Sequence, residues 1–455
     1  MVHLIVELSK YLMILLFACY TFMCFYVLNG KKSEKRQKRI LKKQTKLIFL
    51  IHLNAFAVIF AVQKTVNVLI AYVMQAALLC CILVIYKYIY KRACELIVNN
   101  MCMLLAVGFV ILYRLHPEKA VRQYEIAVAA VVITMVVPFF IHKLHFLDRL
   151  TWLYAIAGLL RLGAVAVLGS VSYGAKLSFT VAGIAIQPSE FVKILFVFFT
   201  ASMLSKSTEF AHVAAATAVA ALHVLVLVVS KDLGAALIFF ITYLIMLYVA
   251  TRSPFYLVSG LLCGSIASVA AYKLFSHVRV RVTAWRDPLS VIDKEGYQIC
   301  QSLFAIGTGG WFGMGLYQGM PKKIPIVEED FVFAAIAEEL GGIFAVCLIM
   351  VCASCYLMFL NIAMQIHDPF YKLLALGLGT VYGFQVFLTV GGVTKFIPST
   401  GVTLPFVSYG GSSLLSTFLL FAIIQGMYIL RDDGRNMERD GGDTADVKGF
   451  SGAGK

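Results

Sequence analysis

Long apolar segments follow one another along most of this 455-residue chain, separated by short polar stretches. A helix that crosses the hydrocarbon core of a membrane needs about 20 mainly apolar residues. Backbone polar groups in lipid must be satisfied within the segment itself, so such segments fold as helices. The sequence therefore predicts an all-α, polytopic membrane bundle of about 13 transmembrane helices. Their expected positions are 4–29, 47–63, 66–86, 99–114, 124–141, 150–170, 188–205, 209–230, 234–250, 254–275, 331–361, 370–392 and 409–430.

The composition agrees with a chain that is surrounded by lipid. Hydrophobic residues make up 61% of the chain and charged residues only 14%, whereas soluble proteins carry about 25% charged residues. Because the chain lacks the polar atoms to cover a water-facing globule, a soluble enzyme, a secreted disulfide scaffold and a disordered tail protein are excluded. Its 11 cysteines lie mostly in apolar segments, where cysteine packs as a small hydrophobe. Its nine histidines are scattered, so no metal site is predicted from its own side chains.

The net charge of +15 is concentrated near the N-terminus. Nine lysines and arginines fall between Lys31 and Lys46, with an apolar segment on each side. Such a loop is typical of the cytoplasmic face of a membrane protein, which makes a nucleic-acid partner a poor explanation of the charge. Alternation of the spans then predicts an outer N-terminus and a cytoplasmic C-terminus. Residues 431–455 are rich in glycine and charge, and we expect a disordered cytoplasmic tail there.

This orientation places most of the unusual polar clusters on the outer side of the membrane. The outer connections are 171–187, 231–233, 276–330 and 393–408. The longest, 276–330, carries six basic and six acidic residues, and its apolar stretches suggest partial helices or re-entrant turns. We therefore expect the chain to act on something exposed at the outer face.

Two candidate sites lie where predicted spans begin. Glu190 and Lys193 are three residues apart, so a helix would place them on one face, and charges within the membrane usually face a cavity. The alternative is that Glu190 only caps the helix after Pro188. Asp232 either caps the next helix or belongs to the same site, and the sequence leaves these alternatives open.

The third candidate is the carboxylate run Glu328, Glu329 and Asp330, directly before the predicted span 331–361. Adjacent carboxylates raise one another's pKa, and a position beside the membrane core suits a general base. A helix cap is again the alternative. Asp287 is a second candidate base, although Asp-Pro usually begins a turn.

Two further groups are harder to interpret. Glu338 and Glu339 lie within the predicted span and need partners, for which Lys193 and Lys395 are available. The glycine-rich stretch 307–315 has no preceding strand, so it is not a nucleotide-binding loop. Close approach of its backbone to the membrane or to a substrate is the better explanation.

Five segments in this order resemble the SEDS family of cell-wall polymerases, the FtsW/RodA/SpoVE type. They are IQPSEFVK at 186–193, KDLG at 231–234, GYQICQSLFAIGTGGWFGMG at 296–315, DFVFAAIAEELG at 330–341 and TGVTLPFVSYGGSS at 400–413. The resemblance covers 99–430, a core of ten predicted spans. Residues 1–98, with three more spans around the basic loop, lie outside the usual core.

The resemblance implies a peptidoglycan glycosyltransferase that polymerises lipid II on the outer face of the bacterial cytoplasmic membrane. It also implies a class B penicillin-binding transpeptidase as partner, and a role in cell division, elongation or sporulation. Asp330 matches the family's essential aspartate and would deprotonate the acceptor's 4-hydroxyl, giving an inverted β-1,4 link and releasing undecaprenyl pyrophosphate. Matching positions imply substrate-binding roles for Gln187, Glu190, Lys193, Asp232, Ser408, Tyr409 and Ser412.

An anionic, lipid-linked substrate requires cations near its pyrophosphate. The outer side offers Lys176, Lys193, Arg281, Lys322, Lys323 and Lys395. A divalent cation, magnesium or manganese, is a further expectation at the pyrophosphate.

Two other functions compete with glycosyl transfer. A flippase for a lipid-linked precursor would also use membrane-embedded charges, but it needs a polar path that opens to both faces. A catalytically silent scaffold for a transpeptidase would tolerate loss of Asp330.

Overall fold

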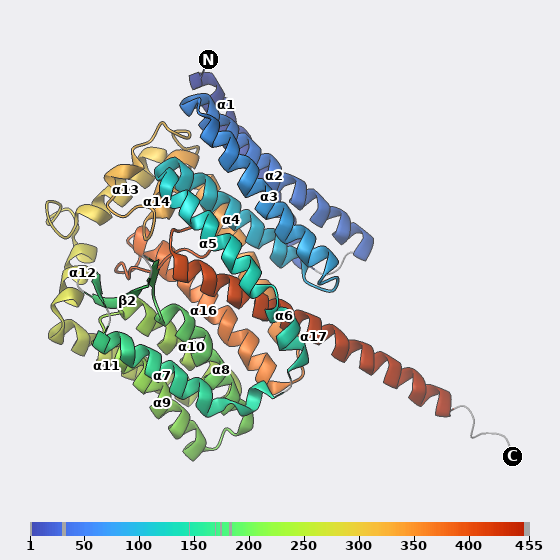
Figure 1. Ribbon diagram of the computed structural model, residues 1–455. Helices are drawn as coiled ribbons and strands as arrows, with labels where there is room; N and C mark the ends of the chain where they lie inside the picture. Colours follow the sequence, from blue (N-terminus) through green and yellow to red (C-terminus); the bar gives the residue numbers. More distant parts are fainter. Residues whose placement is uncertain are drawn as a thin grey trace.

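The computed structural model describes residues 2–29, 33–144, 146–168, 170–172, 175–181 and 184–449. Of the described residues within 170–185 and 432–449, it gives the backbone alone. The chain is a helical membrane bundle, as predicted, with one small antiparallel sheet of order β1-β2-β3 inserted between helices (Figure 1). Lys31 and Lys32 of the basic loop lie outside the described residues.

The first three helices form a layer along one flank of the bundle (Figure 1). They are α1 (Val2–Leu28), α2 (Glu34–Gln63) and α3 (Val66–Tyr88), and α2 and α3 pack against α4 (Glu95–Leu115). The apolar stretch of α4 is buried throughout, because this layer covers one side and the rest of the bundle covers the other.

The remaining elements follow in chain order. They are α5 (Pro117–Thr134), α6 (Val137–Lys143), η1 (Leu147–Arg149), α7 (Thr151–Leu168), β1 (Ser170–Ser172), β2 (Ala175–Val181), β3 (Ile184–Ile186), α8 (Ser189–Lys206), α9 (Phe210–Val229), α10 (Leu233–Thr251), α11 (Pro254–Leu274), α12 (Ser276–Arg286), α13 (Tyr297–Gly309), η2 (Pro321–Lys323), α14 (Val332–Leu340), α15 (Gly342–Gln365), α16 (Pro369–Val393) and α17 (Gly411–Gly449).

Twelve stretches of helix within the described residues are long and apolar enough to cross a membrane. Helix α8 is not among them, because its 18 residues include Glu190, Lys193 and Lys206. It nevertheless packs between α7, α9, α10 and α16, and it corresponds to a thirteenth predicted span. Two of these three charges, Glu190 and Lys193, belong to the site described below, whereas Lys206 lies at the other end of the helix.

Two expectations need correction, those for the span 331–361 and for the tail from 431, and the expected partial helices of 276–330 are confirmed. The predicted span 331–361 is two helices, α14 and α15, because the chain breaks at Gly341 with a φ of +90°. The outer connection 171–187 contains a small sheet, and the expected partial helices of 276–330 are α12, α13 and η2. The tail from 431, predicted to be disordered, continues α17 to Gly449 and projects from the bundle in Figure 1. Residues 450–455 lie outside the described part of the chain.

Helix α4 supports the segment that joins α16 to α17 through a glycine. A Cβ at Gly108 would lie 2.5 Å from the Phe406 carbonyl oxygen and 2.9 Å from Val407 Cα. The segment 394–410, which joins α16 to α17, therefore rests directly on the backbone of α4.

We expect Gly108→Ala to lower the stability of the purified protein by about 1–3 kcal/mol, the usual effect of overpacking a buried contact. The matched control is Gly163→Ala in α7, where a Cβ would meet no atom within 4 Å. This control should leave the melting temperature unchanged or raise it, because alanine favours a helix. Thermal unfolding in detergent measures the melting temperatures of both variants. Equal melting temperatures for Gly108→Ala and wild type would contradict the close contact between α4 and segment 394–410.

Candidate active site

Asp330 lies in the turn immediately before α14, next to Arg281 from α12. Gly401, in the non-helical segment after α16, lies close to both side chains. A Cβ at Gly401 would lie 3.5 Å from Asp330 Oδ2 and 3.7 Å from Arg281 Nη2. Gly401 has a φ of +71°, which also favours glycine. Arg281 is oriented by a hydrogen bond from Nη1 to the Ser399 carbonyl oxygen at 3.1 Å. Three segments that are distant in sequence thus meet around one carboxylate.

The surroundings of Asp330 shift its protonation toward neutral pH. Burial raises the pKa of the Asp330 carboxyl to about 6, against the lowering effect of Arg281 and with a further raising effect from Glu328. A carboxylate with this pKa is largely ionised at neutral pH and is still basic enough to accept a proton. Burial lowers the pKa of Arg281, while Asp330 and Asp232 act in the opposite direction.

Glu328 is already engaged, unlike Asp330. Its carboxylate accepts from Lys119 Nζ and lies 3.8 Å from His116 Nε2. Burial alone would raise the pKa of Glu328, but the Lys119 hydrogen bond and charge outweigh it, and the net pKa is lowered. Its backbone oxygen accepts from the N–H of Tyr409 at 2.8 Å, and Lys119 Nζ lies 5.3 Å from the Tyr409 ring centroid. Glu328 therefore anchors the loop that carries Asp330.

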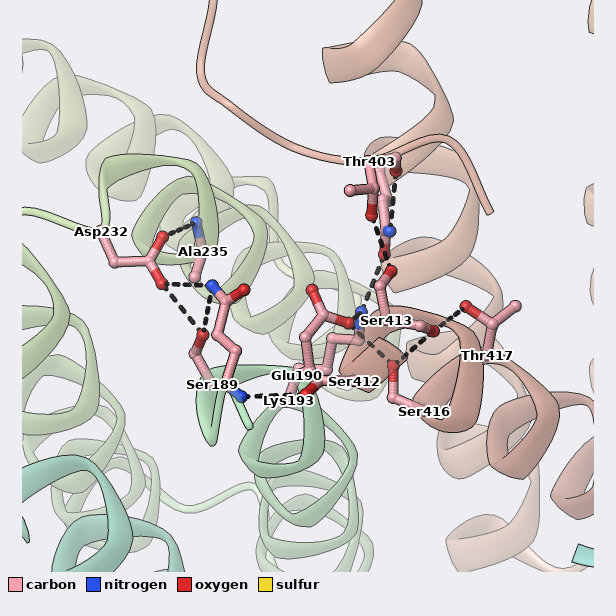
Figure 2. Close-up of polar contacts among 12 residues, drawn as sticks. Ser189, Glu190, Lys193, Asp232, Ala235, Thr403, Ser412, Ser413, Ser416 and Thr417 are labelled. Carbon is pink, nitrogen blue, oxygen red and sulfur yellow. Dashed lines mark hydrogen bonds and ion pairs between the residues drawn. The ribbon is translucent and has the colours of Figure 1, made fainter. Parts of the chain in front are cut away.

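A second polar cluster lies at the start of α8 (Figure 2). Lys193 Nζ contacts Glu190 Oε2 at 2.6 Å, which confirms that the two share a helix face. Lys193 also donates to Gln385 Oε1 at 2.8 Å, and Ser416 Oγ donates to Glu190 Oε2 at 2.8 Å. The pair is thus held by α16 and α17, and a capping role alone does not explain it.

Asp232 caps α10 and also binds residues before α8 (Figure 2). Its Oδ1 accepts the Ala235 N–H at 3.1 Å, and its Oδ2 accepts from Ser189 Oγ at 2.9 Å and from Gln187 Nε2 at 3.4 Å. Ser412 Oγ in turn accepts the N–H of Gln187 at 2.9 Å. Burial raises the pKa of Asp232, although these donors oppose the shift. Asp232 therefore caps α10 and also belongs to the hydrogen-bond network at the start of α8.

The non-helical segment 394–410 connects the two clusters. Near its middle, Gly401 adjoins Asp330, and a Cβ at Gly234 of α10 would lie 3.0 Å from the Thr400 carbonyl oxygen. Gln385, the partner of Lys193, donates from Nε2 to the Thr403 carbonyl oxygen at 3.0 Å. Further along, Ser408 is buried and its Oγ accepts the N–H of Leu404 at 2.9 Å.

The remaining predicted cations are less closely involved. Lys322 and Lys323 are exposed on η2, and Lys395 lies beside Trp285, whose indole N–H donates to the Lys395 carbonyl oxygen. The side chain of Lys176 lies outside the described residues. Asp287 occupies a turn after α12, where its Oδ1 accepts the Ser290 N–H at 3.4 Å.

The expected partners of Glu338 and Glu339 were wrong. Glu339 forms an ion pair with Arg114 of α4 at 2.7 Å, and Glu338 accepts the Met320 N–H at 2.9 Å. The glycine-rich stretch closely approaches the C-terminal end of α14, where Gly315 N–H donates to the Glu339 carbonyl oxygen at 2.8 Å. Its backbone therefore closely approaches another part of the protein.

Sequence reasoning missed Lys119, Arg114, Gln385 and Gly401. Arg114 and Gln385 carried a usable signal, since each is a strongly polar residue inside a predicted span. The contacts of Lys119 and Gly401 depend on tertiary folding, and no local pattern marks them.

An apolar groove leads from the bundle surface to this site. It has a volume of about 660 Å³ and lies between α9, α10, α11, α12 and α16. Arg281, Ser399 and Thr400 line its polar end, whereas Leu261 and Phe387 are typical of the rest. Helix α11 has no buried residue, so this side of the groove faces lipid. The groove suits a ligand with a long apolar chain and an anionic head.

No group of three or more histidine, cysteine, aspartate or glutamate side chains within the described residues is placed to hold a metal ion. The carboxylates whose charges act on Arg281, at the polar end of the site, are Asp330 and Asp232.

Comparisons with known proteins agree with this arrangement. The family model FtsW/RodA/SpoVE, described as a cell cycle protein, matches residues 93–428. The peptidoglycan glycosyltransferase RodA of Mycobacterium tuberculosis (strain ATCC 25618 / H37Rv) is 36% identical over 359 residues, covering 72% of this chain and 76% of that protein. Stage V sporulation protein E of Bacillus subtilis (strain 168) is 35% identical, covering 56% of this chain and 71% of that protein.

Solved structures show the same fold. A chain from a peptidoglycan synthase complex, solved in work on the coordination of polymerization and crosslinking, aligns with a TM-score of 0.62 at 25% identity. The alignment covers 75% of this chain and 98% of the other. The crystal structure of the Thermus thermophilus rod shape determining protein RodA aligns with a TM-score of 0.56 at 24% identity, covering 74% of this chain and 97% of that one.

We expect Lys193→Met to destabilise the protein by about 3–5 kcal/mol, because it leaves a buried carboxylate without its cation. The double variant Glu190→Gln/Lys193→Met should recover part of this loss, since it removes both charges together. Melting temperatures of the purified proteins measure both effects. A double variant no more stable than Lys193→Met would contradict a direct coupling between the two charges.

Proposed function

We infer that this chain, which belongs to the FtsW/RodA/SpoVE family of cell cycle proteins, is a peptidoglycan glycosyltransferase. The observation that carries this inference is the position of Asp330. It is a carboxylate with a raised pKa beside Arg281, and Arg281 lines the polar end of a lipid-facing groove. A membrane enzyme that elongates a glycan on a lipid carrier requires a base for the acceptor hydroxyl, a cation for the pyrophosphate and an apolar groove for the lipid chain.

We propose lipid II and the growing glycan strand as the substrates. The polyprenyl chain of the donor would lie in the groove beside α11, which places its pyrophosphate near Arg281. Charge complementarity supports this pose, because the Arg281 guanidinium lines the polar end of an otherwise mainly apolar groove.

The proposed reaction is one inverting displacement. Asp330 accepts the proton of the acceptor's 4-hydroxyl as that oxygen attacks the anomeric carbon of the donor. The new C–O bond forms as the bond from that carbon to the pyrophosphate oxygen breaks, which releases undecaprenyl pyrophosphate and gives a β-1,4 link. Arg281 would stabilise the negative charge that develops on the leaving group.

We propose that the site faces outward from the bacterial cytoplasmic membrane. Counting α8 with the twelve apolar stretches gives an odd number of membrane crossings. The N-terminal end of α1 and the C-terminal end of α17 therefore lie on opposite sides of the membrane. The basic stretch from Lys35 to Lys46 then lies on the cytoplasmic side by the positive-inside rule. Asp330 belongs to the opposite side, together with the N-terminal end of α1.

A partner and a divalent cation complete the proposal. The structurally similar chain comes from a peptidoglycan synthase complex, and we propose a class B penicillin-binding transpeptidase as the partner here. Magnesium or manganese would be held by pyrophosphate oxygens and water. This donor set suits a cation that arrives with the substrate, which would screen the pyrophosphate charge.

Reconstitution with the transpeptidase and lipid II tests the function directly. We expect wild type to form glycan polymer and Asp330→Asn to lose it by a factor of about 100 or more, because general-base catalysis contributes about 10²–10⁴. The matched control is Asp287→Asn, a turn carboxylate in the same outer connection, which should keep wild-type activity. Equal polymer from wild type and Asp330→Asn would refute the base. Transfer of lipid II between leaflets without any polymer would favour transport.

The dependence of polymerisation on pH tests the state of Asp330. A base must be ionised, so kcat/KM should fall as the pH drops through about 6, the raised pKa of Asp330. Arg281 lowers this pKa, so Arg281→Gln should move the acid limb to higher pH as well as reducing the rate. Lys294→Gln, an exposed lysine of the same connection, should leave the limb in place. An unmoved limb in Arg281→Gln would contradict the electrostatic coupling.

A further inference from the structure

The N-terminal layer touches the core at its outer end through a buried lysine. Lys10 of α1 is only 8% exposed, pairs with Glu7 at 2.8 Å and donates to the Gly313 carbonyl oxygen at 3.2 Å. The approach is close, since a Cβ at Gly315 would lie 2.6 Å from Val6 Cγ1. A lysine is rarely buried without a specific partner, so this contact with the glycine-rich stretch is selective.

A second contact comes from the end of α2. Gln63 Nε2 donates to the Tyr317 hydroxyl at 2.5 Å, and the Arg114 guanidinium lies 4.2 Å from the Tyr317 ring centroid. Arg114 forms the ion pair with Glu339, which also accepts the Tyr317 N–H at 3.2 Å. Tyr317 has a φ of +69°, a conformation that needs support from its surroundings. The layer therefore contacts both halves of the segment 310–320.

This segment holds one end of α14. Met314 N–H donates to the Glu338 carbonyl oxygen at 2.9 Å, and Met320 N–H donates to its side chain. Helix α14 has nine residues, all of them buried, and Asp330 lies two residues before its first residue. Because a short helix moves as a rigid rod, a shift at Glu338 is transmitted to Asp330. The connection 321–330 leads from the same segment to Asp330 along a second route.

We propose that the N-terminal layer is a built-in clamp that positions Asp330, with Lys10 and Gln63 as the positioning residues. This rests on the proposed function, because it assigns the layer to the same active site. Residues 1–92, outside the matched family region, would then act on catalysis without touching the substrate.

The test uses the full-length chain with its partner and lipid II. Lys10→Met and Gln63→Leu should each lower kcat about tenfold or more, because small displacements of a catalytic group are costly. KM should stay within about twofold, since the clamp does not contact substrate. Lys10→Arg should restore the rate by supplying a donor to the Gly313 carbonyl oxygen. The control is Lys38→Met, which removes a cation from an exposed ion pair with Glu34 elsewhere in the same layer.

Hydrogen exchange provides a readout that does not need activity. The amides of Met314, Gly315 and Met320 should exchange about tenfold faster in Lys10→Met and Gln63→Leu, as expected when a buried hydrogen-bond partner is lost. Amides of α16 should be unaffected. Unchanged exchange of 314–320 in both variants would overturn the clamp, and so would a wild-type kcat in both. If wild type forms no polymer, the proposed function fails, and the exchange data still decide whether the layer holds this segment.

Discussion

The bundle depends on how it satisfies the backbone of a segment that is not helical. Residues 394–410 follow α16 at its C-terminal end, and irregular backbone at the membrane is tolerated only where protein or a cavity surrounds it. Side chains from three helices supply the missing hydrogen bonds. From α16, Gln385 and Thr389 donate to the carbonyl oxygens of Thr403 and Val402. From α5 and α12, Gln123 and Arg281 donate to the carbonyl oxygens of Ser408 and Ser399. Ser302 of α13 donates to the carbonyl oxygen of Val393, the last residue of α16, just before the segment begins. The hydrogen bonds that satisfy the backbone of this segment therefore also hold the residues of the site together.

The carboxylates of the two clusters differ in how completely they are paired with cations. Glu190 is neutralised by Lys193 and bound by Ser416, and Glu328 is neutralised by Lys119. Within the described residues, the structure records no ion pair for Asp330, although Arg281 is close enough to influence its pKa. A carboxylate that is fully paired is a poor base, because its ionised form is already stabilised. Asp330 keeps both its basicity and its ionised state because its cation is near but not bound to it.

The sequence was sufficient for features that depend on local chemistry and insufficient for those that depend on packing. Hydropathy predicted the spans, and even α8 was recovered, because its charged residues lie near its two ends and leave an apolar run between them. The pairing of Glu190 with Lys193 follows from helix periodicity. The third member, Gln385, is 192 residues from Lys193, and only the packing of α16 on α8 brings it there. The partner of Glu339 was mispredicted because Arg114 lies at the end of a different span, and a cation's position in the sequence does not show which helix it faces.

The glycine-rich stretch shows most clearly how a motif can be recognised before its physical role is known. Helix α14 ends inside the bundle, and the last carbonyl groups of any helix lack partners within it. Here the N–H groups of Met314 and Gly315 supply those partners, and Gly342 N–H donates to Gly310 in return. Side chains at the glycines would prevent this contact: a Cβ at Gly313 would lie 2.5 Å from the Glu339 carbonyl oxygen. The glycines therefore serve to cap a buried half-helix, and the same close backbone contact allows α1 to reach the segment from outside the core.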